Sequence, residues 1–503
     1  MGNPQLVLLA GGLYVVLLLT LGLLGRRAQP ARTLSEHFLA GRSLGFLVLL
    51  LTLFATQYSG NSLSGFPGKT YRSGLSYIMS VTFMIGIVSG YLLFVPQLFR
   101  EARRGRYLTP TDYLTDRFRS PFLSYTSAVI FAVTLCNFLL AQLMALGHAV
   151  AGLTDGRIPY AAGVLGGMVV IFVYEWLGGL RAVAWTDALQ GLILMVGLAL
   201  VVGLLMLEVG TPAAVVAQIL EVAPEKAANP SLQICLTWLS SFLLLGLGAP
   251  LYPQAIQRIY AARRLVELRK ALMVMAVMPL FAITTVVFVG AVGIALFPNL
   301  DGVGSDQVTF RVLAYLVDVR PAAALPVLLV MMAVLAAIMS TADSALLSLS
   351  SILTKDFAAR ILGYEGSQAE RLTRLAPIFS LAVLAGLGSL ALQPRFTLWR
   401  LLEIKFEVLI QLSPAFVLGT LHHRGDRRAF AARDMTLGLV AGLVVALSAY
   451  AAGIRSLGGI HPGVLGVMVN YAAVLASRGL RLRGQGHPPY DPTADPNPTA
   501  AAT

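Results

Sequence analysis

The sequence predicts an all-α integral membrane protein with about 13 transmembrane helices, ten of which form two five-helix repeats of inverted topology. Three observations support this fold class. The composition is too apolar for a water-facing surface, and the apolar residues fall into long continuous segments. Two of these segments are interrupted by glycine, proline and polar residues at corresponding positions.

The composition excludes most soluble classes. Of the 503 residues, 57% are hydrophobic and only 12% are charged, whereas a soluble domain has about 45–50% apolar and about 25% charged residues. A soluble enzyme, a nucleic-acid-binding protein and a disordered chain are therefore excluded. The two cysteines, Cys136 and Cys235, provide neither a disulfide framework nor a metal-binding spacing.

Thirteen apolar segments have lengths suited to a bilayer, which a helix of about 20 residues crosses. Because the runs are continuous, they do not fit the alternating strands of an outer-membrane barrel. The segments lie at about 5–25, 45–66, 75–98, 122–151, 158–176, 185–207, 235–257, 271–297, 323–350, 375–393, 404–421, 435–453 and 461–477.

Lysine and arginine predict the orientation of these segments. No basic residue precedes the first segment, and Arg26 and Arg27 follow it, which is opposite to a secretory signal. With the N-terminus outside, 27 of the 37 basic residues lie on the cytoplasmic side, as the positive-inside rule requires. The net charge of +13 therefore needs no nucleic acid to explain it. We expect a protein of the plasma membrane, in a bacterium the inner membrane, with a cytoplasmic C-terminus.

The two interruptions lie in segments 2 and 7. The first covers residues 55–62 and 65–68, and the second covers residues 246–254. Glycine and proline are common in membrane helices, and a single break would be ambiguous. Two breaks five segments apart, each with polar neighbours, favour an inverted-repeat secondary transporter with its substrate site between them.

This interpretation divides the chain into five parts. They are a peripheral N-terminal helix and cytoplasmic loop at 1–44, a first repeat at 45–207, a second repeat at 235–421, two peripheral helices at 435–477, and a disordered cytoplasmic tail at 478–503. We expect no appended soluble domain, so the function should reside in the membrane helices.

Segment 9 predicts a cation site. Ser340 and Thr341 are adjacent hydroxyls, and Ala337 lies one turn earlier. Carbonyl groups freed near Ala55 and Tyr58 could complete a shell of neutral oxygens for Na⁺. The alternative is that both hydroxyls only bond their own helix and aid packing.

Segment 9 also carries Asp343. An ionisable residue at membrane depth is a functional hypothesis by default.

Four stretches of the chain resemble the sodium:solute symporter family, which includes sodium–proline, sodium–pantothenate and sodium–galactose transporters. They are residues 38–42 with the first break, 178–191, 253–262, and 337–344 leading to Lys355 and Asp356. The resemblance covers roughly residues 35–420. It implies the LeuT architecture, with ten core helices in two inverted repeats.

The resemblance also implies coupling to Na⁺. The family's sodium ligands fall on the carbonyls of Ala55, Tyr58 and Ala337 and the hydroxyls of Ser340 and Thr341. Asp187 matches an acid thought to assist sodium passage, so Asp187 and Asp343 together form the predicted sodium pathway. Where the sodium–proline branch has an acid in the first break, this chain has Gln57, which argues against assuming that branch's substrate.

The substrate should lie near the bilayer midplane, between the two breaks. The candidates are Thr56, Gln57 and Asn61 from the first break, Ala249, Tyr252 and Pro253 from the second, and the mid-membrane amides Asn137, Gln142 and Gln411. This set contains no Lys or Arg, so an anionic solute would depend on half-helix N-termini. A neutral or zwitterionic solute fits equally well. Glu407, near the outer end of its span, is either a gate or an interfacial residue.

The predicted function is sodium-coupled symport of a small polar organic solute by alternating access. Proton coupling through Asp187 and Asp343 is an alternative, as is a transporter-like sensor that signals to a separate protein. No P-loop, nucleophile–base set or metal cluster supports an enzyme. The expected partners are Na⁺, the lipid bilayer and a solute (amino acid, sugar, carboxylate or vitamin), with no obligate protein partner evident.

Overall fold

The computed structural model describes residues 4–27, 33–154, 156–177, 180–359, 363, 376–421 and 429–484. Within these residues the secondary structure is helical, with two isolated β-bridges, Leu44 to Ala262 and Leu457 to Ile460. Gly178 and Gly179 of the second family-like stretch lie outside the described residues.

The chain forms long α-helices joined by short ones, where η marks a 3₁₀ or π turn. The elements are α1 (Pro4–Arg27), α2 (Leu34–Leu39), η1 (Ala40–Arg42), α3 (Phe46–Gln57), η2 (Asn61–Gly65), α4 (Phe66–Ser73), η3 (Leu75–Thr82), α5 (Phe83–Gly105), α6 (Pro110–Phe118), α7 (Pro121–Leu153), α8 (Tyr160–Leu177), α9 (Leu180–Glu208), α10 (Pro212–Val222), η4 (Pro224–Ala227), α11 (Leu232–Gly248), η5 (Ala249–Leu251), α12 (Pro253–Ala261), α13 (Leu265–Met275), α14 (Met278–Leu296), η6 (Gly304–Gln307), α15 (Val308–Val319), η7 (Pro321–Ala323), α16 (Ala324–Ser351), η8 (Ile352–Ala359), α19 (Ala376–Ala391), α20 (Leu398–Leu409), η10 (Ile410–Leu412), α21 (Ser413–Thr420), α22 (Ala432–Ala451) and α23 (Pro462–Gly484).

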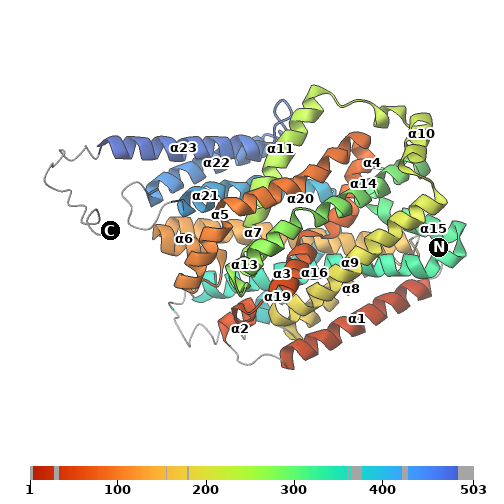
Figure 1. The fold of residues 1–503 in the computed structure, drawn as a ribbon, viewed down its shortest axis with the longest axis horizontal. Helices are drawn as coiled ribbons and strands as arrows, with labels where there is room; N and C mark the ends of the chain where they lie inside the picture. The colour runs from red at the N-terminus through yellow and green to blue at the C-terminus, as the bar shows by residue number, and fades with distance from the viewer. Residues whose placement is uncertain are drawn as a thin grey trace, which may run out of the picture.

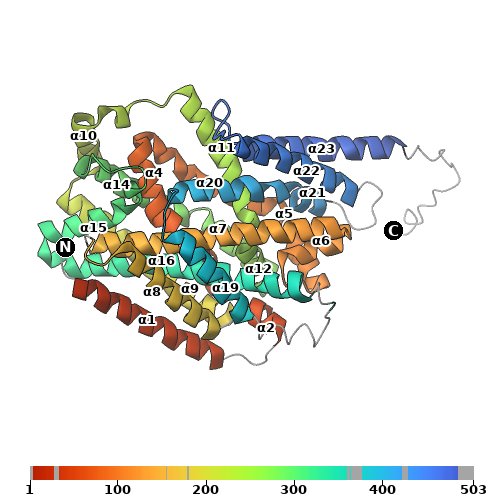
Figure 2. The ribbon, with the colours of Figure 1, turned by 180° about the vertical axis from the view of Figure 1, so that it is seen from behind.

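The helices form one bundle, and most run along its long direction (Figure 1). Both ribbon views place α22 and α23 along one edge and α1 along the opposite edge (Figure 2). Helix α1 packs on α8 and α9, and α23 packs on α22 and α20. Between these edges, α16 packs against α7 and α9, and α9 packs against α3. This arrangement puts α3 and α16, which carry the predicted cation site, in the interior.

Every one of the thirteen predicted apolar segments falls on a helix or on consecutive helices. Within the described residues, eight stretches are long and apolar enough to cross a membrane, and a ninth is a bent pair. Shorter apolar helices also occur at Tyr160–Val173 and Ile378–Ala391. The all-α membrane fold is therefore confirmed, whereas the count of thirteen spans stays a prediction.

Both predicted helix breaks are present. Helix α3 ends at Gln57, Tyr58 is extended with φ −97° and ψ 116°, and the two halves of the helix meet at a bend of 52°. At the second break, α11 ends at Gly248, η5 follows it to Leu251, Tyr252 has a ψ of 127°, and α12 begins at Pro253. Proline has no N–H to continue a helix and is favoured at a helix start, so the residue types explain the position of this break.

The connections hold helices that the sequence analysis did not predict, among them α10 and α15. At the C-terminus, α23 continues to Gly484. The first residues of the segment 478–503, predicted to be a disordered tail, are therefore helical, and residues 485–503 lie outside the described part of the chain.

Close packing of α5 on α11 depends on Gly90. A Cβ atom at this position would lie 2.0 Å from the carbonyl oxygen of Gly246. We therefore expect Gly90→Ala to destabilise the protein by about 1–3 kcal/mol, the usual cost of overpacking, and thermal unfolding in detergent would measure it. The matched control is Gly203→Ala, because no atom lies within 4 Å of its added methyl group. Equal melting temperatures for the two variants would contradict the prediction.

Candidate functional site

The first break frees two main-chain carbonyl groups for a ligand. The Ser62 N–H donates to Ser59 O at 2.9 Å, so it does not occupy the carbonyl of Tyr58. The Ser59 N–H donates to the side-chain oxygen of Ser62 at 3.3 Å, which leaves the carbonyl of Ala55 free in the same way. In an unbroken α-helix each N–H donates to the carbonyl four residues earlier, so Ser59 would bond Ala55 and Ser62 would bond Tyr58.

Helix α16 brings the predicted hydroxyl to these carbonyls. The Thr341 hydroxyl donates to Tyr58 O at 3.1 Å and lies 3.5 Å from Ala55 O. Ser340 is fully buried, and its Oγ has no hydrogen-bond partner within 3.5 Å among the described residues, although it lies beside the Asp187 carboxylate. Ala337 is also buried and lies one turn before Thr341, on the same helix face. The donors are thus neutral oxygens, one of them lacking a partner, and such a set fits Na⁺.

Next to this site lies a buried ion pair. The Arg258 Nη2 donates to Asp187 Oδ2 at 2.6 Å, and the two side chains are 1% and 0% exposed. The Thr52 hydroxyl donates to the same carboxylate oxygen at 2.5 Å. Arg258 also donates to the Ser344 hydroxyl at 2.5 Å. This network joins α3, α9, α12 and α16, and therefore ties both broken helices to the helix that carries Thr341.

Nothing in the sequence pattern pairs Asp187 with Arg258. Arg258 lies in the last turn of α12, five residues after Pro253, and is buried, whereas its sequence context indicates only a basic residue of the cytoplasmic side. The role of Asp187 in a sodium pathway stays a prediction. Asp343 is buried on α16, two residues after Thr341, and its role likewise stays a prediction.

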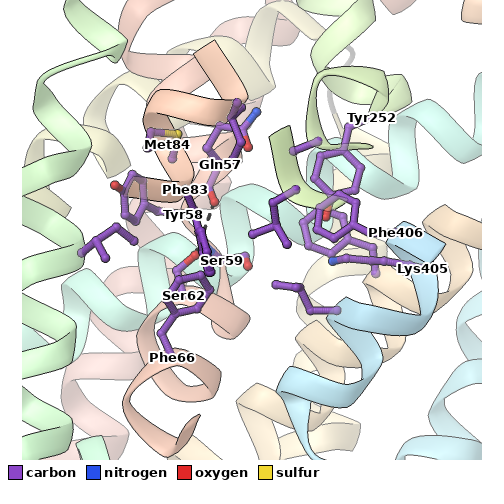
Figure 3. A pocket seen from close by; sticks show the side chains of 16 residues that line it. Gln57, Tyr58, Ser59, Ser62, Phe66, Phe83, Met84, Tyr252, Lys405 and Phe406 are labelled. Atoms are coloured by element: carbon purple, nitrogen blue, oxygen red, sulfur yellow. Dashed lines mark hydrogen bonds between the residues drawn. The ribbon is translucent and has the colours of Figure 1, made fainter. Parts of the chain in front are cut away.

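A cavity of about 40 Å³ lies between the two breaks, enough for a few water molecules. Figure 3 shows Gln57, Tyr58, Ser59 and Ser62 on one side, with Tyr252, Lys405 and Phe406 facing them. The other lining residues are Phe66, Phe83, Met84, Ile87, Phe138, Leu245, Ala249, Ile283 and Leu402. A solute larger than this volume must separate some of these side chains in order to bind.

Three of the nine predicted substrate residues line this cavity: Gln57, Ala249 and Tyr252. The Gln57 amide also donates to the Tyr91 hydroxyl at 2.8 Å. Asn61 and Asn137 do not line it, and Pro253 instead begins α12. These placements concern the cavity alone, and contact with a solute stays a prediction for every candidate.

The other predicted polar residues are engaged in helix packing. The Thr56 hydroxyl donates to Thr52 O at 2.6 Å within its own helix. Gln142 accepts the Gly60 N–H at 2.9 Å and so supports the first break. Gln411 donates to Gly463 O at 2.8 Å, which places it in the contact of η10 with α23. None of the three lines the cavity.

The predicted substrate set contains no Lys or Arg, but the structure places one lysine at this cavity. Lys405 lines the cavity and is 2% exposed, although the predicted orientation places it among the basic residues of the outer side. The reason is that α20 begins at Leu398, six residues before the predicted start at 404. Lys405 therefore lies two turns inside the helix rather than at its end.

Glu407 does not lie in the cavity. Its carboxylate is 3.8 Å from Arg400 Nη1 and 3.8 Å from His461 Nδ1. It therefore lies between α20 and the start of α23, a placement that leaves its predicted gate or interfacial role open.

On the predicted outer side, Asp306 of η6 joins several elements of the bundle. Its Oδ1 is 3.1 Å from Arg72 Nη1, and its Oδ2 accepts the Leu398 N–H at 2.7 Å. Ser64 of η2 donates to the Asp306 carbonyl. Burial raises the pKa of this carboxyl from 3.8 to about 6, although Arg72 opposes the shift.

This raised pKa predicts a pH-dependent stability. Between about pH 4 and pH 6 the folded protein retains a proton that the unfolded chain has released, so the contribution of Asp306 falls as the pH rises through this window. The expected total is about 2–3 kcal/mol. Asp306→Asn should therefore gain stability relative to the parent protein between pH 4.5 and pH 6.5 in thermal unfolding. A difference that does not change with pH would contradict this.

Comparison with known proteins gives the following similarities. The family model described as "Sodium:solute symporter family" matches residues 37–431. The sodium/pantothenate symporter of Escherichia coli is 28% identical over 472 residues, covering 92% of this chain and 94% of the relative. A sodium/proline symporter of Staphylococcus aureus is 27% identical over 443 residues, covering 86% and 84%.

Among solved structures, an outward-open, substrate-bound Na⁺-coupled sialic acid symporter has a TM-score of 0.74 at 18% identity, covering 95% of this chain and 98% of that one. At this identity the likeness concerns the fold.

Proposed function

Since this chain belongs to the sodium:solute symporter family, we propose that it couples Na⁺ entry to the uptake of a small polar organic solute by alternating access. The family and the relatives described above are transporters rather than enzymes, which confirms the expectation of a non-enzymatic membrane protein. Family membership also supports Na⁺ as the coupling ion. The solute and the transport cycle are the parts proposed here.

The observation that carries the proposal is the position of Tyr58. Its main-chain carbonyl accepts a hydrogen bond from the Thr341 hydroxyl in the candidate sodium site. Tyr58 is also one of the residues that line the cavity between the breaks. A Na⁺ ion bound to Ala55, Tyr58, Ala337, Ser340 and Thr341 would hold α3 against α16 and fix one wall of the solute site. By linkage, a solute that favours this arrangement raises the Na⁺ affinity by the same factor.

The proposed orientation rests on the distribution of basic residues, with the N-terminus outside and the C-terminus in the cytoplasm. In Figure 1, α1 begins at one end of the bundle and α23 ends at the other, which agrees with termini on opposite sides. The proposed membrane is the plasma membrane, in a bacterium the inner one.

Uptake into proteoliposomes tests the proposal. The first solutes to use are pantothenate and proline, for which the two relatives are named, followed by other amino acids, sugars and carboxylates. We expect accumulation above the external concentration when Na⁺ is high outside, and its abolition when Na⁺ is equal on both sides. Accumulation that follows a pH gradient instead of the Na⁺ gradient would show that H⁺ is the coupling ion. Solute binding without any uptake would favour the sensor.

A further inference from the structure

Lys405 is a cation without a hydrogen-bond partner inside the proposed solute cavity. Its Nζ has no acceptor among the described residues, and the whole residue is only 2% exposed. Figure 3 shows the side chain extending from α20 toward the residues of the first break. A buried amine carries a charge at low cost only when a partner compensates it, and an anion entering the cavity would be such a partner.

Aromatic rings surround this ammonium group. The Nζ lies 3.6 Å from the ring centroid of Phe138 and 5.2 Å from that of Tyr252, and these two rings are stacked at 4.9 Å. Ring faces attract a cation, but they carry no net charge. None of the 16 cavity-lining residues is acidic. The charge of Lys405 is therefore held in place by the rings but is not neutralised by the cavity.

Two main-chain amides just before the second half of the broken helix are already engaged. The Gly60 N–H donates to Gln142, and the Ser59 N–H donates to Ser62. Such amides are among the groups through which a half-helix N-terminus would hold an anion. Since both are satisfied by the protein itself, the ammonium group of Lys405 is the better-placed partner for a negative charge in this cavity.

The geometry points to a substrate that carries a carboxylate group, which Lys405 binds through a charge-assisted hydrogen bond. This inference rests on the proposed function and specifies the class of solute. The opposite wall offers Gln57, Ser59 and Ser62, which would accept hydroxyl or amide groups at the other end of the molecule. Between the two lie apolar side chains such as Phe83, Ile87 and Leu402. The class is thus a small monocarboxylate with an apolar middle and a polar, uncharged far end.

The test is a thermal-shift measurement on the purified full-length protein, with and without Na⁺. The probes are three matched pairs of a carboxylate and a neutral counterpart: pantothenate and panthenol, nicotinate and nicotinamide, phenylacetate and phenylacetamide. We expect at least one carboxylate to raise the melting temperature in Na⁺ while its neutral counterpart does not. Equal effects within every pair, or no effect of any carboxylate, would overturn the assignment.

Variants locate the effect at Lys405. Lys405→Met should weaken binding of the active carboxylate about ten- to hundredfold, and Lys405→Arg should recover part of it. The matched control is Lys69→Met, because Lys69 also lies over an aromatic ring, that of Trp399 at 5.8 Å, but does not line the cavity. Unchanged carboxylate affinity in Lys405→Met would overturn the inference.

The ligand-free protein gives a second readout. If Lys405 serves a ligand, Lys405→Met removes a buried polar group that has no hydrogen-bond partner among the described residues and should raise the melting temperature of the ligand-free protein. A purely structural cation–ring role predicts a lower one.

The two proposals also fail in different ways. If only neutral solutes bind and their binding requires Na⁺, the carboxylate assignment falls and sodium-coupled symport stands. If the carboxylate requires Lys405 but neither its binding nor its uptake depends on Na⁺, the coupling falls and the assignment stands.

Discussion

Replacing Ser340 and Thr341 together by alanine should raise the Na⁺ concentration needed for half-maximal solute binding at least about tenfold. The change removes one hydroxyl that lies 3.1 Å from Tyr58 O and a second, buried hydroxyl that has no partner in the described structure. Both groups are predicted to coordinate the ion, and both residues are fully buried, so each alanine removes one oxygen ligand from the predicted shell. Titration of solute-induced thermal shifts with Na⁺ measures the effect.

The matched control for this double variant is Ser350→Ala. Ser350 is also a buried serine of α16 whose hydroxyl lacks a partner among the described residues. It lies nine residues beyond Thr341, about 13 Å along the helix. We expect its Na⁺ requirement to equal that of the parent protein. If the double variant shows the parent's Na⁺ dependence at equal expression, the site is wrong.

Breaking the Asp187–Arg258 pair should cost about 3–5 kcal/mol of stability, because each single change leaves an uncompensated buried charge. Both side chains are at most 1% exposed and lie 2.6 Å apart. We therefore expect Asp187→Asn and Arg258→Met each to reduce the yield of folded protein and its melting temperature strongly. The double variant should recover part of this loss, since it removes both charges at once. Size-exclusion profiles and thermal unfolding measure the three variants.

A surface pair provides the comparison. Arg263 and Glu267 are as close, at 2.5 Å, but Arg263 is 57% exposed, and exposed pairs contribute only about 0–1 kcal/mol. Arg263→Met should therefore change the melting temperature little. The interpretation of the buried pair would be refuted by single variants as stable as Arg263→Met, or by a double variant no better than the sum of the singles.

The sequence was sufficient to predict the helical membrane class and the two breaks. Long apolar runs have few alternatives in a bilayer, because every backbone polar group must be satisfied within the segment. Pro253 marks the second break because its chemistry forbids the helix to continue. The hydroxyls of Ser340 and Thr341 were recognisable because polar residues are rare in such a background. The Thr341 hydroxyl donates to the carbonyl of Tyr58, and the binding of Na⁺ by these groups stays a prediction.

Which polar residues face the cavity could be decided only by the tertiary structure. In a soluble helix the apolar stripe identifies the buried face, but a membrane helix is apolar on its lipid side and on much of its protein side. The sequence therefore gave no reason to separate Gln57, which lines the cavity, from Gln411, which bonds Gly463. The sequence also does not reveal how deep a residue lies in the bundle when its helix begins before the apolar run, as α20 does.

The amino-acid sequence by itself thus determined the class of the protein and its broken helices, and it predicted residues for a sodium site, since these follow from local composition and backbone chemistry. The buried pair of Asp187 with Arg258 and the position of Lys405 among aromatic rings were decided by the tertiary structure alone. The physical reason is that both depend on the rotation and depth of helices from different parts of the chain, which packing fixes and no single segment encodes.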